Sequence, residues 1–191
     1  MKKRTAVIGA LVSLMPFGQP LLIGTGAALT SSAVILSAPE KAQGESADYY
    51  INRAINKEDA GDLKGAINDY TKAIEINPNY ALAYGNRGYL KGLKQIGDFY
   101  GAISDQTKAI EINPRYALAY MNRGYAKNEI KDYQGAIIDY SKRIEIDPKD
   151  ESGYIYRANS KLMLEDFQGA LQDCTKCIDL SSEEDSDFDY P

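Results

Sequence analysis

The sequence contains no histidine and no tryptophan, and it has two cysteines among 191 residues. Histidine is the commonest general base, the side chain that most readily changes charge near neutral pH, and a frequent metal ligand. Because histidine is absent and only two thiols are present, a zinc site would be incomplete. The composition therefore predicts a non-enzymatic protein without catalytic residues, metal or cofactor.

An excess of basic residues is also missing. The chain carries 22 Lys and Arg against 27 Asp and Glu, which gives a formal net charge of −5. Proteins that bind nucleic acids use clustered Lys and Arg to contact the phosphate backbone. No large cluster of that kind occurs in this sequence. We therefore expect no nucleic-acid partner.

Two sequence markers recur with one common spacing. Asn-Arg-Gly or a near copy begins at residues 52, 86, 122 and 156, and Gly-Ala-Ile or Gly-Ala-Leu begins at residues 65, 101, 135 and 169. The first series advances by 34, 36 and 34 residues and the second by 36, 34 and 34, which indicates a repeat array. The predicted units are residues 47–80, 81–116, 117–150 and 151–182, followed by an acidic tail at 183–191.

Each unit has the pattern of two amphipathic helices. Between Gly65 and Ile76 the apolar residues recur at i, i+1, i+4, i+7 and i+8, which is one face of a helix. An Asp precedes each second helix and is expected to cap it (Asp62, Asp98, Asp132 and Asp166). A proline is expected to end three of the second helices (Pro78, Pro114 and Pro148). We attribute the Gly of each Gly-Ala pair to close packing between two backbones.

These residues resemble the tetratricopeptide repeat (TPR) family, in its bacterial Asn-Arg-Gly variety. The matching residues are Tyr50, Tyr84, Tyr120 and Tyr154; Gly88 and Gly124; Ala66, Ala102, Ala136 and Ala170; Tyr70 and Tyr140; Ala73 and Ala109; and the three prolines. The resemblance implies an all-α fold, a right-handed superhelical solenoid of four antiparallel helix pairs. It also implies a concave groove, lined by the first helices, that binds a peptide or a protein.

The family geometry assigns ten residues to that groove: Ile51, Ile55, Leu82, Tyr89, Leu118, Met121, Tyr125, Ile155, Asn159 and Met163. This surface is mostly apolar and rich in tyrosine, so it suits an amphipathic helix or a hydrophobic peptide. Chaperone-binding members of the family use a Lys/Asn/Arg clamp for a carboxylate. Asn86 and Asn122 are present here, but the partnering Lys and Arg are missing. An acidic chaperone tail is therefore not the expected partner.

A recurring Arg and a recurring Asp depart from the family pattern. The Arg residues replace the usual Leu, and each Asp follows 16 residues later, or 18 in the second repeat (Arg53 and Asp69, Arg87 and Asp105, Arg123 and Asp139, Arg157 and Asp173). A half-buried Arg needs a charged partner. We therefore predict structural ion pairs between the two helices of each repeat, in preference to ligand-binding residues.

Three further departures concern packing. The second repeat has two extra residues within Gly92–Gln95, which either extend its first helix or lengthen the turn. Gln106 and Arg143 occupy positions expected for core residues, so packing should be looser there. The fourth repeat has Cys174, Cys177 and Ser182 in place of Tyr, Ala and Pro, and a divergent terminal repeat is common in such arrays.

The N-terminal region has a basic start and two apolar runs. Lys and Arg at positions 2 to 4 precede the runs at 6–15 and 21–38. The first run is shorter than the roughly 20 residues that span a bilayer, and Gly, Ser and Thr dilute the second. This layout is typical of a secretory signal. Residues 1–44 are therefore predicted to be a signal peptide or an N-terminal membrane anchor.

Small residues would allow cleavage after Gly44 or Ala33, and we favour Gly44 because it directly precedes the first repeat. Whether the segment is cleaved or kept as an anchor, the basic end should stay in the cytoplasm. A disordered or core-packing N-terminal helix is the remaining alternative. We expect the repeats in the periplasm or an equivalent lumen, with membrane contact only through the N-terminal segment.

Cys174 and Cys177 form the one string that resembles a catalytic motif. A redox Cys-x-x-Cys needs a thiol of low pKa at a helix N-terminus. These cysteines instead fall deep in a predicted second helix, on its core face, so we favour a structural role over thiol redox chemistry. The acidic tail is expected to be solvated, although Phe188 and Tyr190 leave open that it covers the fourth repeat or docks on a partner.

The function predicted from these observations is a scaffold or adaptor that binds a peptide or protein partner in the groove. Analogy with similar arrays adds assistance to the assembly of a membrane or envelope complex. The alternative is a structural module that self-associates, for example as a homodimer, through an uncapped fourth repeat. A thiol redox protein using Cys174 and Cys177 is the third hypothesis.

Overall fold

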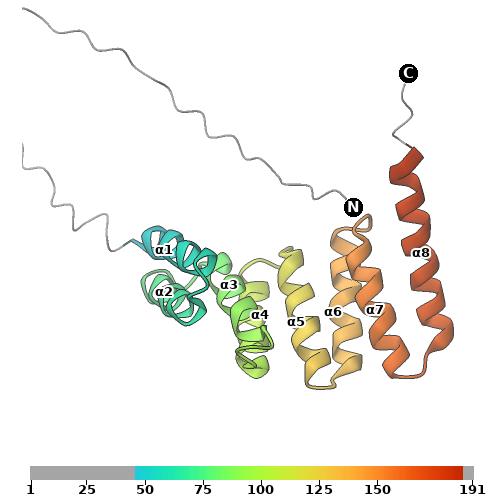
Figure 1. Cartoon of the computed structure of the whole chain (residues 1–191), viewed down its shortest axis with the longest axis horizontal. Coiled ribbons are helices and arrows are strands. Elements are labelled where there is room, and N and C mark those ends of the chain that lie inside the picture. Colours follow the sequence, from blue (N-terminus) through green and yellow to red (C-terminus); the bar gives the residue numbers. More distant parts are fainter. Residues whose placement is uncertain (1–45, 187–191) are drawn as a thin grey trace, which may run out of the picture. The chain divides into compact units, whose positions relative to one another are not determined.

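The computed structural model describes residues 46–186, and the side chains of residues 46–181. This part of the chain forms helices and the turns between them (Figure 1). The helices are α1 (Ala47–Asp59), α2 (Leu63–Ile76), α3 (Ala81–Gly92), α4 (Phe99–Ile112), α5 (Ala117–Glu129), α6 (Tyr133–Ile146), α7 (Glu151–Met163) and α8 (Phe167–Ser186). They pack as four antiparallel pairs, and each pair packs on the next.

The predicted all-α, TPR-like fold is therefore confirmed, while the right-handed superhelix stays a prediction. The predicted signal peptide or anchor at 1–44 lies outside the described residues. Among the helices of residues 46–186, none is long and apolar enough to cross a membrane.

The second helices begin where the capping Asp residues predict. The carboxylates of Asp62, Asp98, Asp132 and Asp166 accept hydrogen bonds at 2.9–3.0 Å from the N–H of the Gly three residues later. A Cβ atom on any of these glycines would lie 2.0–2.2 Å from Oδ2 of the same Asp. Glycine is needed here because the capping carboxylate fills the space of a side chain. Our attribution to close packing of two backbones was wrong.

The two extra residues of the second repeat lengthen a turn. Residues 93–98 connect α3 to α4, whereas three residues connect the two helices of each other repeat. At the other end of the array, α8 continues to Ser186, beyond the predicted repeat boundary at 182. Ser182 occupies the position that Pro78, Pro114 and Pro148 hold after the other second helices. Serine keeps its backbone N–H, so the helix can continue through this position where a proline would end it. The start of the predicted acidic tail is thus part of α8.

The core is built from small residues and a few large ones. Tyr70, Leu90 and Tyr140 are fully buried, and Ala residues fill most other core positions. Gln106 is also fully buried, and the looser packing expected there stays a prediction. Its Nε2 donates to the carbonyl of Gly85 at 2.8 Å, while its Oε1 has no hydrogen-bond partner. The guanidinium of Arg143 binds Asp150 and Asp147, but its Nε is buried without a partner.

The structure brings the four predicted Arg and Asp pairs together across the two helices of each repeat. Nε and Nη2 of each Arg donate to the two oxygens of its Asp, over 2.5–3.0 Å. A Lys one turn after the Arg binds the same carboxylate at 2.8–2.9 Å (Lys57, Lys91, Lys127 and Lys161). A role for these lysines was not predicted, although each follows its Arg by four residues in the sequence. Each repeat therefore holds one buried carboxylate between two cations.

The same Arg residues also connect neighbouring repeats. Nη1 of Arg87 donates to Thr71 of the preceding repeat at 3.0 Å. Arg123 and Arg157 make the equivalent bonds to Thr107 and Ser141, at 3.1 and 3.0 Å. The Arg series thus stabilises both the helix pair and the stacking of pairs.

Acid is expected to destabilise the first repeat through Asp69. The hydrogen bond from Arg53, helped by Lys57 and opposed by burial, lowers the pKa of Asp69 from 3.8 to about 2. Because the folded-state pKa is the lower one, this stabilisation is complete above about pH 4 and is lost as the pH falls from about 4 to 2. Thermal melts should show Tm falling in that window, and less steeply for Asp69→Asn. An unchanged acid dependence in the variant would contradict the assignment.

Candidate binding groove

The first helices of the later repeats lie side by side and form one surface. Helix α5 packs against α3 and against α7, whereas the second helices pack chiefly against first helices. Elements that approach one another lie on the inner side of a curved array, so the first helices line the concave side. Their exposed side chains therefore face a common groove.

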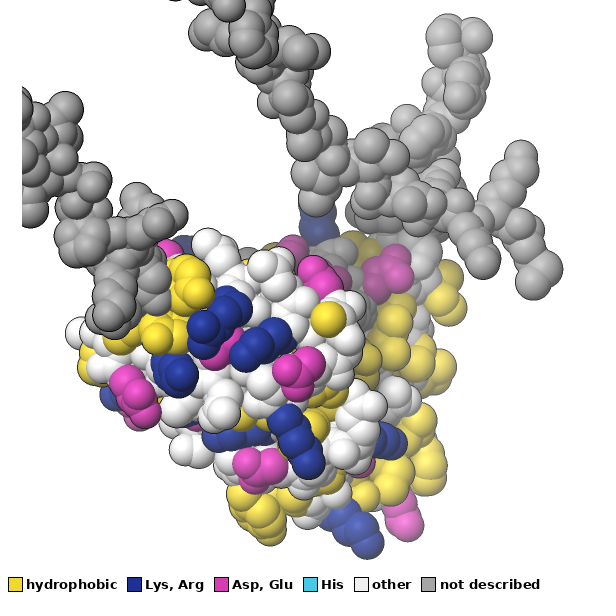
Figure 2. Space-filling view, turned by 60° about the vertical axis from the view of Figure 1, so that its left-hand side comes forward, with side chains coloured by type: hydrophobic (Ala, Val, Ile, Leu, Met, Phe, Trp, Pro, Cys, Tyr) yellow, Lys and Arg dark blue, Asp and Glu magenta, His cyan; other side chains and the backbone are white. Residues whose placement is uncertain are grey.

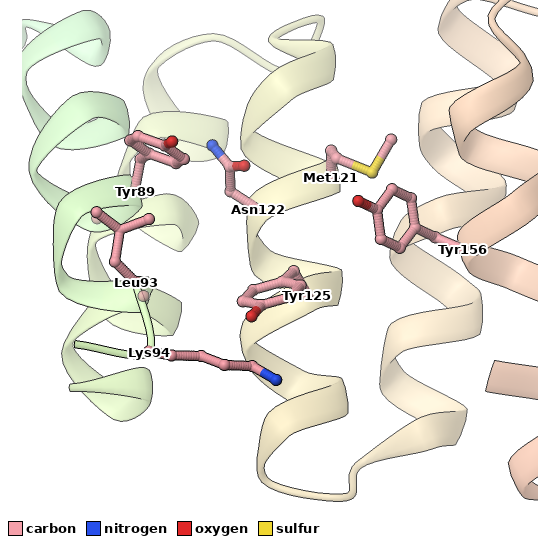
Figure 3. A pocket seen from close by; sticks show the side chains of 9 residues that line it. Tyr89, Leu93, Lys94, Met121, Asn122, Tyr125 and Tyr156 are labelled. Carbon is pink, nitrogen blue, oxygen red and sulfur yellow. The ribbon is translucent and has the colours of Figure 1, made fainter. Parts of the chain in front are cut away.

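A hollow of about 360 Å³ opens in this groove between α3, α5 and α7 (Figure 3). Tyr89 and Asn122 approach each other from α3 and α5, and Tyr156 extends from α7 toward the same space. The complete lining is Gly88, Tyr89, Gly92, Leu93, Lys94, Met121, Asn122, Tyr125 and Tyr156. Aromatic and aliphatic side chains thus surround a small number of polar groups, which is the usual composition of a binding pocket.

Local departures from the repeat create this hollow. Gly88 and Gly92 are one helical turn apart on α3, both are buried, and both line the hollow. Gln106 lies beneath Gly88, where a Cβ would approach its Nε2 to 2.8 Å, and it occupies the position that Tyr70 and Tyr140 hold in other repeats. The long turn at 93–98 adds Leu93 and Lys94 to the rim. The second repeat is therefore the one whose irregularities shape a site.

The electrostatics of the hollow are nearly neutral. Lys94 is the one charged residue in its lining, and its Nζ lies 3.4 Å from Glu129. Burial, with Glu129 as a second cause, raises the pKa of Tyr125 above its ordinary value. Tyr125 therefore remains a neutral phenol at physiological pH, able to donate or accept a hydrogen bond.

The structure places the ten predicted groove residues in different environments. Tyr89, Met121 and Tyr125 meet in the hollow. Asn159 and Met163 line a second depression beside Asn128, and Ile155 lines a third near Asp150. The remaining side chains are Ile55, Leu82 and Leu118, which are exposed outside these depressions, and Ile51, which is 4% exposed and belongs to the core. Burial makes Ile51 unavailable to a ligand, and the binding role of the others stays a prediction.

Four lining side chains were missed from the sequence: Leu93, Lys94, Asn122 and Tyr156. Leu93 and Lys94 belong to the two-residue insertion, whose position in space was unknown. Tyr156 replaces the Asn of the recurring triplet, and this substitution was a visible signal. Its ring stacks on Tyr140, with centroids 5.6 Å apart.

The two cysteines differ in their exposure. Cys174 is exposed, which contradicts the prediction that it lies on the core face, because no helix in the described range packs over this side of α8. Cys177 is half-buried, and burial raises the pKa of its thiol. A raised pKa disfavours the thiolate that redox chemistry requires. Residues 46–181 also hold no group of three or more acidic or thiol side chains arranged for a metal.

The surface shown in Figure 2 has interspersed charges. Lys and Arg side chains lie next to Asp and Glu and beside hydrophobic side chains, without gathering into one basic patch on this face. This distribution gives a phosphate backbone no continuous track to follow.

Two segments match models of known families. Residues 59–95 match a model described as TPR repeat, and residues 117–150 match one described as tetratricopeptide repeat. The second range coincides with the third predicted repeat. No curated protein sequence matches the chain significantly.

Several solved structures share the fold. A crystal structure of MamA is 22% identical with a TM-score of 0.72, covering 76% of this chain and 84% of that one. MamA from Desulfovibrio magneticus RS-1 is 19% identical with a TM-score of 0.70, covering 76% and 81%. The first TPR of Spaghetti (RPAP3), bound to the HSP90 peptide SRMEEVD, is 24% identical with a TM-score of 0.60, covering 62% and 93%.

The helix pairs, the two model matches and the structural neighbours agree on one architecture. The Asn-Arg-Gly variety within it stays a prediction. Residues 59–95 and 117–150 thus match tetratricopeptide repeat models, and the described helices share the fold of MamA.

Proposed function

We propose that this protein is a non-enzymatic adaptor that holds an apolar segment of a partner protein in the groove of α3, α5 and α7. The supporting observation is the hollow between these helices, in which three tyrosines, Met121 and Leu93 surround a space of about 360 Å³. That volume accepts a large hydrophobic side chain, and Asn122 and the tyrosine hydroxyls can bond to the backbone next to it. The partner is an amphipathic helix or a hydrophobic peptide.

An acidic peptide is a weaker candidate. The structurally similar RPAP3 domain is bound to the peptide SRMEEVD, which carries several carboxylates. Here Lys94 is the one cation among the lining residues, and Glu129 already pairs with it. A peptide of that charge would meet too little positive potential to repay the loss of its hydration.

Charged substitutions in the hollow are expected to abolish binding. Peptides selected from an amphipathic-helix library on the wild-type protein should lose at least about tenfold in affinity for Tyr89→Glu/Tyr125→Glu, because a buried carboxylate there has no partner. Tyr100→Glu is the control, since Tyr100 is 75% exposed on α4 and outside the hollow. Fluorescence-anisotropy titration measures the change. Equal affinity of the double variant and the control would reject this groove as the site.

We further propose that the repeats act outside the cytoplasm, delivered by residues 1–44, and that they assist assembly of a membrane or envelope complex. The basic and apolar layout of that segment supports export. Intact-mass measurement of the native protein tests cleavage, with a new N-terminus expected directly after Gly44. Retention of Met1 would exclude a cleaved signal.

A further inference from the structure

The outer side of α8 carries a continuous apolar stripe. Phe167, Leu171 and Ile178 are 66%, 67% and 69% exposed, and Cys174 between them is exposed as well. The corresponding residues of the first three repeats are half-buried or buried, because the first helix of the next repeat packs over them. Within the described residues, no helix does this for α8. The stripe is thus a repeat-stacking surface without its partner.

Helix α8 also keeps the hydroxyl group that takes part in stacking between repeats. In each internal junction, an Arg of the following repeat donates to a hydroxyl at one fixed position of the second helix, as Arg87 does to Thr71. Thr175 occupies that position in α8 and is exposed. Its hydroxyl donates to the carbonyl of Leu171, as the hydroxyl of Thr71 does to Ile67. The acceptor lone pairs of Thr175 remain available to a second protein.

The N-terminal end of the array cannot fill this surface in the same way. At each junction between repeats, the first helix of the following repeat has a small residue at one fixed position, which is Ala83, Ala119 or Gly153. A Cβ on Gly153 would already lie 2.8 Å from the side chain of Ile144. Tyr49 holds this position in α1, where its ring packs 5.3 Å from the guanidinium of Arg53. A phenol does not fit where Ala is the largest side chain accepted. Head-to-tail stacking of two copies is therefore blocked.

The α8 stripe is instead complementary to itself. Its members recur with spacings of 4, 3 and 4 residues, which is the a/d pattern of a coiled-coil seam. The residues next to the centre of the stripe, Gln168, Gln172 and Thr175, are uncharged, and Asp179 follows in the same row, so the centre of the contact brings no like charges together. In an antiparallel pair, Phe167 lies opposite Ile178 of the second copy, and Leu171 lies opposite Cys174.

We propose that the fourth repeat is a homodimerisation surface, in which α8 packs antiparallel against α8 of a second copy around a two-fold axis between Leu171 and Cys174. This two-fold contact closes on itself, so it yields dimers and not filaments. It lies on α8, apart from the groove of α3, α5 and α7, and leaves that groove free for another partner. The contact extends a surface that the chain already uses three times to stack its own repeats.

Sedimentation velocity on the full chain tests the proposal. The average mass should rise from one chain to two over about 10 to 300 µM, the range expected of a weak, reversible dimer. Leu171→Lys places two ammonium groups at the axis and should leave a single-chain species throughout this range. Ile138→Lys is the matched control, because Ile138 is 56% exposed on another second helix, and it should dimerise like the wild type.

A cross-link tests the register. In a Cys177→Ala background, Leu171→Cys should form a disulfide with Cys174 of a second copy under mild oxidation, and Ile138→Cys should not. Far-UV circular dichroism establishes that the exposed substitutions leave the helices intact. A wild-type chain of constant single-chain mass, dimers that survive Leu171→Lys, or equal cross-linking of both cysteine variants would each overturn the proposal.

Discussion

Replacing Asp139 with Asn is expected to lower the free energy of unfolding by about 3–5 kcal/mol, the range seen when one partner of a buried ion pair is removed. The side chain of Asp139 is 1% exposed, and it binds Arg123 at 2.6 and 2.9 Å and Lys127 at 2.8 Å. The amide of Asn keeps the shape of the carboxylate but removes its charge. Two largely buried cations would then face each other without compensation.

Urea denaturation of the wild type, Asp139→Asn and Lys142→Ala measures this effect. Lys142 pairs with Glu145, but both side chains are more than half exposed, so its removal should leave the stability close to that of the wild type. A triple variant separates the loss of charge from the loss of packing. Replacing Asp139, Arg123 and Lys127 together by Met or Leu should restore most of the lost stability, because apolar residues can often replace a buried group of ions without a loss of stability. A loss below about 1 kcal/mol for Asp139→Asn would show that the Asp does not hold the repeat together.

Gly124→Val is expected to destabilise the third repeat by about 1–3 kcal/mol or more, through overpacking. A Cβ at Gly124 would lie 2.7 Å from Cε1 of Tyr140. Tyr140 is fully buried and its ring stacks on Tyr156, so it has little room to retreat. A branched side chain adds two further methyl groups in the same direction, and α5 and α6 must then move apart.

Gly124→Ala is the graded control for that variant. Ala54 occupies the equivalent position in the first repeat, opposite Tyr70, so a methyl group can be accommodated by a small shift. The gain in helix propensity of about 1 kcal/mol offsets part of the crowding. Thermal and urea melts should therefore place Gly124→Ala near the wild type and Gly124→Val well below it. Similar stability of both variants would contradict the close approach of α5 and α6.

Much of the fold could be predicted because its determinants are local and repeated. A capping Asp acts on an N–H three residues away, as at Asp62 and Gly65, and a proline ends a helix wherever it occurs. The Arg and Asp of each repeat recur together, so their pairing could be inferred before their distance was known. The candidate site was less predictable, because Leu93 and Lys94 enter it from a turn whose path depends on two inserted residues.

By itself, the sequence determined the repeat length, the alternation of helices, the caps and the charge pairs, since each depends on spacing along one chain. Only the tertiary structure decided which side chains are exposed to solvent. Ile51 is buried while Tyr89 is exposed, although both were assigned to one face, and Cys174 is exposed where Tyr70 and Tyr140 are buried. The physical reason is that exposure depends on which helix packs next to a residue. Within residues 46–186 no following helix packs over α8, and the local sequence pattern of α8 does not indicate this.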